Sequence, residues 1–286
     1  MTTENLPESV ERFVPHRPPI LMLRELIACD RDTAEGIAWI PQVSPFHAKG
    51  LLPRAFFVEL LAQLVAAAQG YREAGEETPP GGGYLVGVHE FDCYRDAQMG
   101  DSLHLYVRSM NQVEGLNILE GRVTRGDDLL AFGELRCFLV SSFLPPSLAG
   151  AVSRDMDWAG WSSLGDAIRR SMEIVSLNAA TGKAEANVCF APNATVFAGH
   201  FPERPLVPGV VWLEAGFALA TTLLSRQFSL RKIVFARFKA PIGPDHTVRI
   251  VVEVKSHDNE AFLSSRVNAG KTLVAAFEQS LEYKDT

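Results

Sequence analysis

Two long apolar segments, at 55–69 and 210–224, dominate the hydrophobic pattern of the chain. Each has the length of an ordinary helix, and its apolar residues lie on nearly every side of that helix, which indicates a position inside a protein core. Each segment also carries one glutamate, Glu59 or Glu214. The two segments are therefore too short and too polar to cross a membrane as helices.

Shorter segments with alternating apolar and polar residues predict strands around both helices. In the first half these segments lie at 33–40, 103–110, 118–124 and 134–140. In the second half they lie at 184–190, 233–238, 247–255, 262–267 and 272–283. The Pro- and Gly-rich run at 78–83 is typical of a loop. Both halves thus predict one buried helix with several strands packed against it.

The two halves are also repeats of each other. When the sequence is shifted by 155 residues it aligns with itself without a gap, matching Phe46 with Phe201, Leu51 with Leu206, Pro53 with Pro208, Phe57 with Trp212, and Glu59 with Glu214. A repeat of this length indicates two copies of one unit. We expect an N-terminal domain at 1–145, a linker at 146–160 that follows Pro145-Pro146, and a C-terminal domain at 161–286.

Composition narrows the classes of function. The chain has 286 residues, of which 47% are hydrophobic and 21% are charged, and its net charge is −7. These values are typical of a globular protein and argue against nucleic acid as a partner, since nucleic acid favours a basic surface. The N-terminus lacks the pattern of a signal peptide, and the four cysteines lack the spacing of a metal site. We therefore expect free thiols, no bound metal and a cytoplasmic location.

The most constrained part of the sequence runs from Gly199 to Glu214. His200 comes directly before a turn with three prolines, and Pro208-Gly209 then opens the second apolar helix. Proline fixes the backbone angle φ, and glycine adopts backbone conformations that other residues rarely reach. The pattern therefore indicates a group that must be held in place. The turn brings an imidazole and a helix N-terminus together. Such a pair can remove a proton from carbon while it polarises a neighbouring carbonyl.

This run resembles the signature of the 3-hydroxyacyl-acyl-carrier-protein dehydratases of bacterial fatty-acid synthesis, which reads G-H-F-P-x-x-P-x-x-P-G and precedes a helical acid. As in that family, the acid (Glu214) stands fourteen residues after the histidine (His200). The family usually has a glutamine four residues later, where this chain has Ala218. The first half is similar to the companion dehydratase-like subunits of aryl-polyene-type pathways, in its segments 50–53 and 59–63.

The resemblance implies an α+β hotdog fold, in which an antiparallel sheet wraps around a central apolar helix. Because the unit occurs twice, it implies a double hotdog, an intramolecular pseudo-dimer that could assemble further into a homo-oligomer. In the family each active site forms between two units, with the histidine from one and the acid from the other. Applied to this chain, that rule pairs His200 with Glu59 and not with Glu214.

The two halves have lost complementary parts of the family pattern. The first half keeps Glu59 and Gln63, which lie one helical turn apart, but it has Pro45 in place of the histidine and Arg54 in place of the motif glycine. The second half keeps His200 and Gly209. Pairing these two with Glu59 and Gln63 makes one complete site per chain, and the opposite pairing makes none.

Other interpretations of these residues stay open. Glu59 could be a helical acid that reaches the surface, and Glu214 could be a structural relic. His47 lies two positions from the catalytic register and could replace the missing histidine. The segment 14–20 resembles the family's N-terminal P-H-R-x-P motif, so His16 is expected to shape the substrate tunnel rather than to do chemistry. The family's following aspartate is Arg24 in this chain.

The resemblance implies that the chain dehydrates 3-hydroxyacyl thioesters to trans-2-enoyl thioesters. His200, with an ordinary pKa near 6.5, would take the proton at carbon 2. Glu59, with a pKa raised by burial, would protonate the departing hydroxyl, and Gln63 would orient the acid or the water. The Gly209 N–H would stabilise charge on the thioester oxygen. This chemistry needs no metal or redox cofactor.

The substrate would arrive on the phosphopantetheine arm of an acidic acyl carrier protein. No acidic residue occurs between Glu214 and Asp245, where five basic residues fall, and Arg204 precedes them. A local basic patch suits an acidic partner, although an ordinary solvated face would look the same. The candidate docking residues are Arg204, Arg226, Arg231, Lys232, Arg237 and Lys239.

Two alternatives to a dehydratase remain. The same fold presents acyl thioesters to water in hotdog thioesterases, and the loss of motif residues in the first half would suit a non-catalytic acyl-binding scaffold subunit. The sequence leaves open the acyl chain length, the pathway, and whether isomerisation or hydrolysis accompanies dehydration.

Overall fold

The computed structural model describes residues 6, 8–74, 82–140 and 161–284. In these ranges most strands form one continuous antiparallel sheet of thirteen strands. Its N-terminal half contains, in spatial order, β1 (Glu8–Ser9), β2 (Leu23–Cys29), β3 (Thr33–Trp39), β7 (Ser102–Val113), β8 (Leu116–Arg125), β9 (Asp128–Val140) and β5 (Gly82–Cys93). Its C-terminal half continues with β12 (Phe228–Phe238), β15 (Thr272–Tyr283), β14 (Glu260–Ala269), β13 (Val248–His257), β11 (Lys183–Val188) and β10 (Met172–Asn178).

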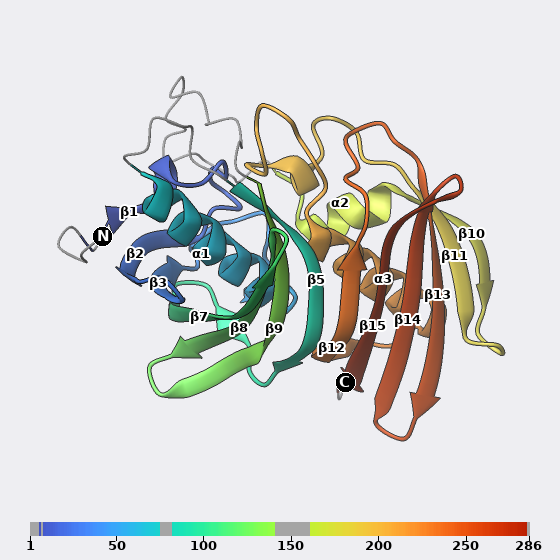
Figure 1. The fold of residues 1–286 in the computed structure, drawn as a ribbon. Coiled ribbons are helices and arrows are strands. Elements are labelled where there is room, and N and C mark those ends of the chain that lie inside the picture. Colours follow the sequence, from blue (N-terminus) through green and yellow to red (C-terminus); the bar gives the residue numbers. More distant parts are fainter. Residues whose placement is uncertain (1–5, 7, 75–81, 141–160, 285–286) are drawn as a thin grey trace.

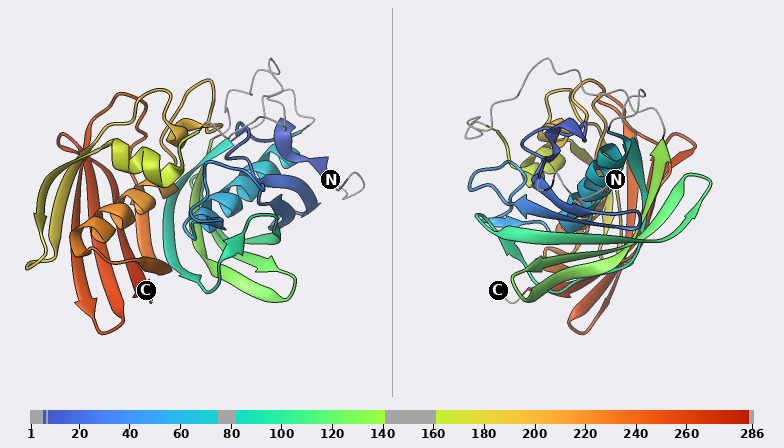
Figure 2. Two further views of the ribbon diagram at one scale, coloured as in Figure 1. Left: turned by 180° about the vertical axis from the view of Figure 1, so that it is seen from behind. Right: turned by 60° about the vertical axis from the view of Figure 1, so that its left-hand side comes forward.

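Each half of the sheet wraps around one helix, as Figures 1 and 2 show. Helix α1 (Phe56–Glu73) packs against β2, β3, β5 and β7, and α3 (Gly209–Leu224) packs against β11, β13 and β14. Both helices are buried on several sides, as their nearly continuous apolar sequences require. The fold is therefore a double hotdog.

The remaining elements are short. A second sheet pairs β4 (Leu51–Leu52) with β6 (Ala97–Gln98), and α2 (Leu164–Arg170) packs near α3. Two 3₁₀ helices, η1 (Val10–Arg12) and η2 (Thr195–Phe197), complete the described elements. The cysteines at 29, 93, 137 and 189 are free thiols, as the sequence predicts. No helix in the described ranges combines the length and the apolar character needed to cross a membrane.

The two halves join at β5 and β12, which pair antiparallel at the middle of the large sheet. In this pairing Phe91 lies opposite Ile233 and Val88 lies opposite Ala236, and all four side chains are buried. The two hotdog units of one chain thus share a continuous sheet, and α1 and α3 also contact each other. This arrangement places the N-terminal turn of α3 close to the first half.

The sequence pattern located both long helices and most strands. Among the described elements of seven residues or more, the pattern missed β2, β5, β10 and α2. It also ended the first helix at residue 69, whereas α1 continues to Glu73. The loop expected at 78–83 is wrong for Gly82 and Gly83, which begin β5, and its other residues lie outside the described ranges. The linker expected at 146–160 also lies outside the described ranges.

Candidate active site

The N-terminal segment of the first half contacts the proline-rich turn of the second half. The Arg17 N–H donates a hydrogen bond to the Gly199 carbonyl oxygen at 2.8 Å. Gly199 has a φ of +76°, and a Cβ atom there would lie 1.9 Å from the Arg17 oxygen. Only glycine allows this approach. As a result the rings of His16 and His200 lie 5.2 Å apart, centroid to centroid.

His200 is held in one orientation by its surroundings. Its Nδ1 lies 2.7 Å from the carbonyl oxygen of Leu206, and since a carbonyl only accepts, Nδ1 carries the proton. The Nε2 atom of the neutral ring therefore keeps its lone pair. The ring stacks on Phe201 at 4.2 Å, and Phe201 has a φ of +53°, a strained value for a bulky residue. Strain of this kind persists where the surrounding structure holds a turn in place.

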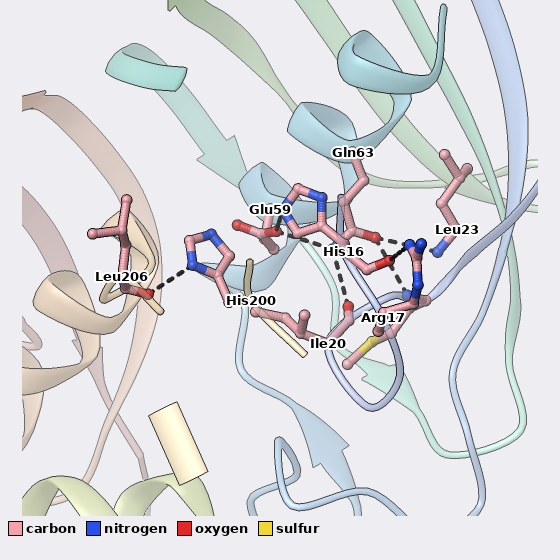
Figure 3. Close-up of polar contacts among 9 residues, drawn as sticks. His16, Arg17, Ile20, Leu23, Glu59, Gln63, His200 and Leu206 are labelled. Carbon is pink, nitrogen blue, oxygen red and sulfur yellow. Dashed lines mark hydrogen bonds and ion pairs between the residues drawn. The ribbon is translucent and has the colours of Figure 1, made fainter. Parts of the chain in front are cut away.

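Glu59 faces this ring from α1 of the other half, and Gln63 lies on the far side of Glu59 from His200 on the same helix (Figure 3). The Gln63 amide nitrogen donates to Glu59 Oε1 at 2.9 Å and to the Ile20 carbonyl at 3.0 Å. The Gln63 amide oxygen accepts from the backbone N–H groups of Met22 and Leu23, at 3.3 and 3.4 Å. Gln63 is fully buried, and these four bonds fix the carboxyl of Glu59 to the backbone around it.

His16 completes a cluster of three buried side chains. Its Nε2 lies 3.5 Å from Glu59 Oε1, and one polar atom each of His16, Glu59 and His200 lies within 4.8 Å of the other two. Sequence reasoning placed His16 in the tunnel wall and did not bring it to the acid. The P-H-R-x-P motif marks His16 in the sequence. Only the fold, however, brings that motif next to the turn that contains His200. Two histidines and a carboxylate at such distances could also hold a metal ion.

These three residues line a cavity of about 340 Å³. Both halves contribute its walls, which include the apolar residues Val65, Ala66, Leu85, Val86, Leu139, Val207 and Val274. Gly209, the first residue of α3, also lines the cavity, and no side chain caps this helix end. The positive end of the α3 dipole is therefore available to a group in the cavity.

Burial shifts the pKa values of the acid and the histidine in opposite directions. Loss of solvent raises the pKa of Glu59 to about 7, although the hydrogen bond from Gln63 opposes the shift. Loss of solvent lowers the pKa of His200 to about 4, against the opposing effect of its bond to Leu206. Burial first, and then the nearby His200 and Arg17, hold the pKa of His16 well below its ordinary value. At neutral pH both histidines are neutral, and a large fraction of Glu59 is protonated.

Three other residues that the motif alignment suggested, Glu214, His47 and Arg54, do not line the cavity. Glu214 and His47 are half-buried, and burial raises the pKa of Glu214 to about 7. Arg54, which replaces the motif glycine, is paired with Asp96 at 2.6 Å and donates to the Leu230 carbonyl of the second half at 2.9 Å. Its side chain thus occupies the position that mirrors the Gly209 helix end.

The candidate docking residues separate into two groups. Arg231 pairs with Glu260 at 2.8 Å, Lys232 pairs with Glu90 at 2.5 Å, and Arg226 lies 3.6 Å above the Tyr283 ring. Arg204 is exposed. Arg237 lies 5.5 Å from the Phe235 ring, and Lys239, which directly follows β12, lines the cavity. The basic residues at or next to the cavity are therefore Lys239 and, two positions before it, Arg237.

Two family models match the chain in tandem. Residues 8–144 match the ApeP-like family, described as ApeP dehydratase, and residues 176–276 match the ApeI-like family, described as ApeI dehydratase. The first match contains Glu59 and Gln63, and the second contains His200 and Gly209. The two matches therefore lie in different halves of the chain.

Individual proteins give a consistent picture. The chain is 32% identical over 105 residues to a 3-hydroxyacyl-[acyl-carrier-protein] dehydratase FabZ of Variovorax paradoxus, a match that covers 30% of this chain and 69% of the relative. It spans about half the length of several other curated relatives.

Among solved structures, the dehydratase domain of PpsC from Mycobacterium tuberculosis has a TM-score of 0.52 at 16% identity, covering 88% of this chain and 94% of that one. A structure described as "oleoyl thioesterase (putative)" from Lactobacillus plantarum has a TM-score of 0.58 at 11% identity, covering 89% of this chain and 96% of that one. These structural likenesses establish the fold alone, because both a dehydratase and a thioesterase share it.

Proposed function

Because this chain belongs to the hotdog family of 3-hydroxyacyl-acyl-carrier-protein dehydratases, we propose that it removes water from 3-hydroxyacyl thioesters held on an acyl carrier protein. The product is the trans-2-enoyl thioester. One observation carries the proposal: polar atoms of Glu59 and His200, from different halves of the chain, lie within 4.8 Å of each other in the wall of one cavity. Their pKa shifts suit an acid and a base that act together at neutral pH.

In the proposed reaction the protein takes one proton from the substrate and gives one proton to it. His200 Nε2 takes the proton from carbon 2, the electron pair forms the carbon 2–carbon 3 double bond, and the carbon 3–oxygen bond breaks. Glu59 gives its proton to the departing hydroxyl, which leaves as water. The site then holds an imidazolium and a carboxylate, and the proton returns to Glu59 before the next turnover. General acid–base groups of this kind each contribute about 10²–10⁴-fold in rate.

Gly209 and Gln63 support these transfers without exchanging protons. The backbone N–H of Gly209, at the uncapped start of α3, stabilises negative charge on the thioester oxygen, a contribution of about 10²–10³-fold. Gln63 holds Glu59 Oε1 and is itself held by Ile20, Met22 and Leu23. A carboxyl held in this way keeps its orientation from one turnover to the next.

The cavity and its surroundings support this substrate class. Its volume of about 340 Å³ and its mainly apolar walls, both aliphatic and aromatic, suit an acyl chain. Lys239 at the cavity and the exposed Arg237 next to it suit the acidic surface of a carrier protein. The tandem of ApeP-like and ApeI-like regions supports a specialised acyl or polyketide-like pathway as well as fatty-acid synthesis.

Mass spectrometry of a 3-hydroxyacyl carrier protein after incubation with the protein tests the proposal. We expect the acyl group to lose one water with the wild type, and we expect His200→Ala to remove this activity without unfolding the protein. Release of free acid would instead assign a thioesterase, and an unchanged acyl group would assign an acyl-binding subunit. Normal turnover by His200→Ala would contradict the assignment of the base.

The two glutamates provide a matched pair of variants. Glu59→Gln should lower kcat by about 10²-fold or more, since the amide cannot donate the acid proton. Glu214→Gln changes the equivalent carboxyl of the other helix. It should have a mild effect, because Glu214 does not line the cavity. The wild-type activity should survive dialysis against EDTA. Loss of activity on dialysis, restored by Zn²⁺, would assign His16, Glu59 and His200 to a metal site instead.

A further inference from the structure

His16 is the buried polar group of the site whose purpose the proposed reaction leaves open. It is 7% exposed, it lines the cavity, and its ring packs against His200 and Phe201. Its Nδ1 has no hydrogen-bond partner among the described residues. Burying an imidazole with one unpartnered nitrogen costs free energy, and an apolar side chain would fill the same space without that cost. We therefore expect the other ring nitrogen to contribute something that an apolar side chain could not.

That other nitrogen faces the acid. Glu59 Oε1 is approached by the Gln63 amide nitrogen at 2.9 Å and by His16 Nε2 at 3.5 Å, from two different segments of the first half. Figure 3 shows both side chains directed at the same carboxyl, with His200 on its other side. We propose that His16 is a positioning residue that, together with Gln63, occupies Glu59 Oε1 with donors, so that the acid proton is carried on Oε2.

The choice of tautomer follows from the unpartnered nitrogen. A neutral imidazole carries one proton, and a buried N–H without an acceptor is rarer in proteins than an acceptor without a donor. Placing the proton on Nε2 leaves only a lone pair unsatisfied at Nδ1. It also turns Nε2–H into a second donor to Glu59 Oε1. An oxygen that accepts from two donors has its lone pairs engaged, so the carboxyl's own hydrogen belongs on the other oxygen.

A neutral donor suits an acid better than a cation would. An imidazolium beside Glu59 would strongly favour the carboxylate and deprive the site of its acid. The charged and titratable groups that face His16 are Glu59, His200 and Arg17, and burial together with the last two keeps His16 neutral. On the β9 side the Glu59 carboxyl faces the thiol of Cys137, whose pKa burial raises to about 12, so that this group is neutral as well.

The 3.5 Å separation is longer than an ordinary hydrogen bond. Contacts between catalytic groups are often long in the free protein and shorten when the substrate fills the site. The inference rests on the proposed dehydration, because it assigns His16 to orienting the acid of that reaction. Its test therefore includes one measurement that does not depend on turnover.

The test compares His16→Leu with His16→Gln. Leucine fills the space without a donor, whereas glutamine can place an amide N–H near the position of Nε2. For His16→Leu we expect kcat to fall on the order of tenfold, as for loss of one hydrogen bond at about 1.4 kcal/mol, with KM nearly unchanged. A hydrogen-bond donor to Oε1 favours the carboxylate. Loss of that donor should therefore also raise the pKa of Glu59 and move the alkaline limb of the pH–rate profile to higher pH. His16→Gln should recover most of both effects.

Titration of the Glu59 carboxyl by ¹³C NMR gives the same comparison without substrate. A Glu59 pKa that rises in His16→Leu and returns in His16→Gln supports the inference even if the wild type proves not to dehydrate, in which case only the proposed function fails. Equal pKa values and equal rates in the two variants would show that His16 only fills space, and would overturn the inference. If His16→Leu does not fold, His16→Phe provides the same absence of a donor with the bulk of a ring.

Discussion

Burial acts in opposite directions on the pKa values of Glu59 and His200, the two groups that we propose exchange protons with the substrate. The same loss of solvent that raises the pKa of Glu59 to about 7 lowers that of His200 to about 4, because the protein interior disfavours the charged form of each. Between these values both groups have the protonation state that dehydration needs. A site in water could not reach this state, since an ordinary carboxyl ionises before an ordinary imidazole loses its proton.

A bell-shaped pH profile follows from these two values. The kcat/KM for dehydration should rise as His200 becomes neutral above about pH 4 and should fall as Glu59 loses its proton above about pH 7. Gln63→Leu removes a donor that favours the carboxylate, so it should move the alkaline limb to higher pH. In Glu59→Gln the residual activity should lack that limb. Persistence of the limb in Glu59→Gln would show that another group is the acid.

The sequence could suggest His200, Glu59, Gln63 and Gly209 because each stands in a motif. It could not bring His16 to the acid. The contact depends on where the 14–20 segment meets the turn at Gly199, and that meeting is a backbone contact between opposite halves of the chain. A local sequence pattern can predict a turn, but it does not predict which other segment that turn contacts in the folded protein.

At the scale of elements, errors in the sequence interpretation have identifiable physical causes. The first apolar segment stops at residue 69, directly before a glycine, and glycine commonly follows the end of a helix. In the structure Gly70 lies inside α1, where a Cβ atom would come within 2.5 Å of the Phe13 oxygen. Strand β5 begins with two glycines and bends at two register shifts, which hides its alternation. Strand β10, at the edge of the sheet, is exposed along most of its length and lacks a buried apolar face.

Gly199→Ala should disrupt the contact between the two motif segments. An alanine there would need a left-handed backbone and would place Cβ 1.9 Å from the Arg17 oxygen, so the turn or the N-terminal segment must move. Gly270→Ala is the matched control, since Gly270 has a φ of +58° and a Cβ atom added there would meet no other atom within 4 Å. The control should lose about 1–2 kcal/mol of unfolding free energy and little activity.

For Gly199→Ala we expect a larger loss of stability and a loss of kcat out of proportion to it, because His16 and His200 would separate. Thermal unfolding and dehydration rates of the two variants provide the comparison. Equal effects would mean that the close approach at Gly199 contributes nothing beyond its backbone conformation.

At the scale of the whole molecule, the two halves have specialised within one continuous sheet. The first half supplies Glu59 and Gln63, the second supplies His200 and Gly209, and Arg54 occupies the mirrored helix end, where it bonds to both halves. A fused pair can lose one of two equivalent sites without losing function, since each chain still builds the other. The motifs predict this division of roles, and the two tandem family matches fall in different halves of the chain.

Docking of the proposed carrier protein depends on where charged residues lie relative to the cavity. Lys232 and Lys239 are seven residues apart along an extended segment, a separation of about 23 Å at roughly 3.3 Å per residue. Exposed charges are screened over about 8–10 Å near physiological salt. A carrier docked at Lys239 would therefore feel Arg237 strongly and Lys232 weakly, and Lys232 and Arg231 already have acidic neighbours.

We therefore expect the double reversal Arg237→Glu with Lys239→Glu to raise the apparent KM for a carrier-bound substrate, by slowing association, and to do so most at low salt. The reversal of Arg231 and Lys232 to glutamate is the matched control, with the same change of charge nearer the start of β12, and should have a smaller effect. A short soluble thioester separates docking from chemistry, because it needs no carrier surface and should be turned over at nearly the same rate by all three proteins. Equal losses on both substrates would mean that the reversals damage the cavity. A larger loss from the Arg231 and Lys232 pair would place the docking surface at that end of the strand, beside Arg54.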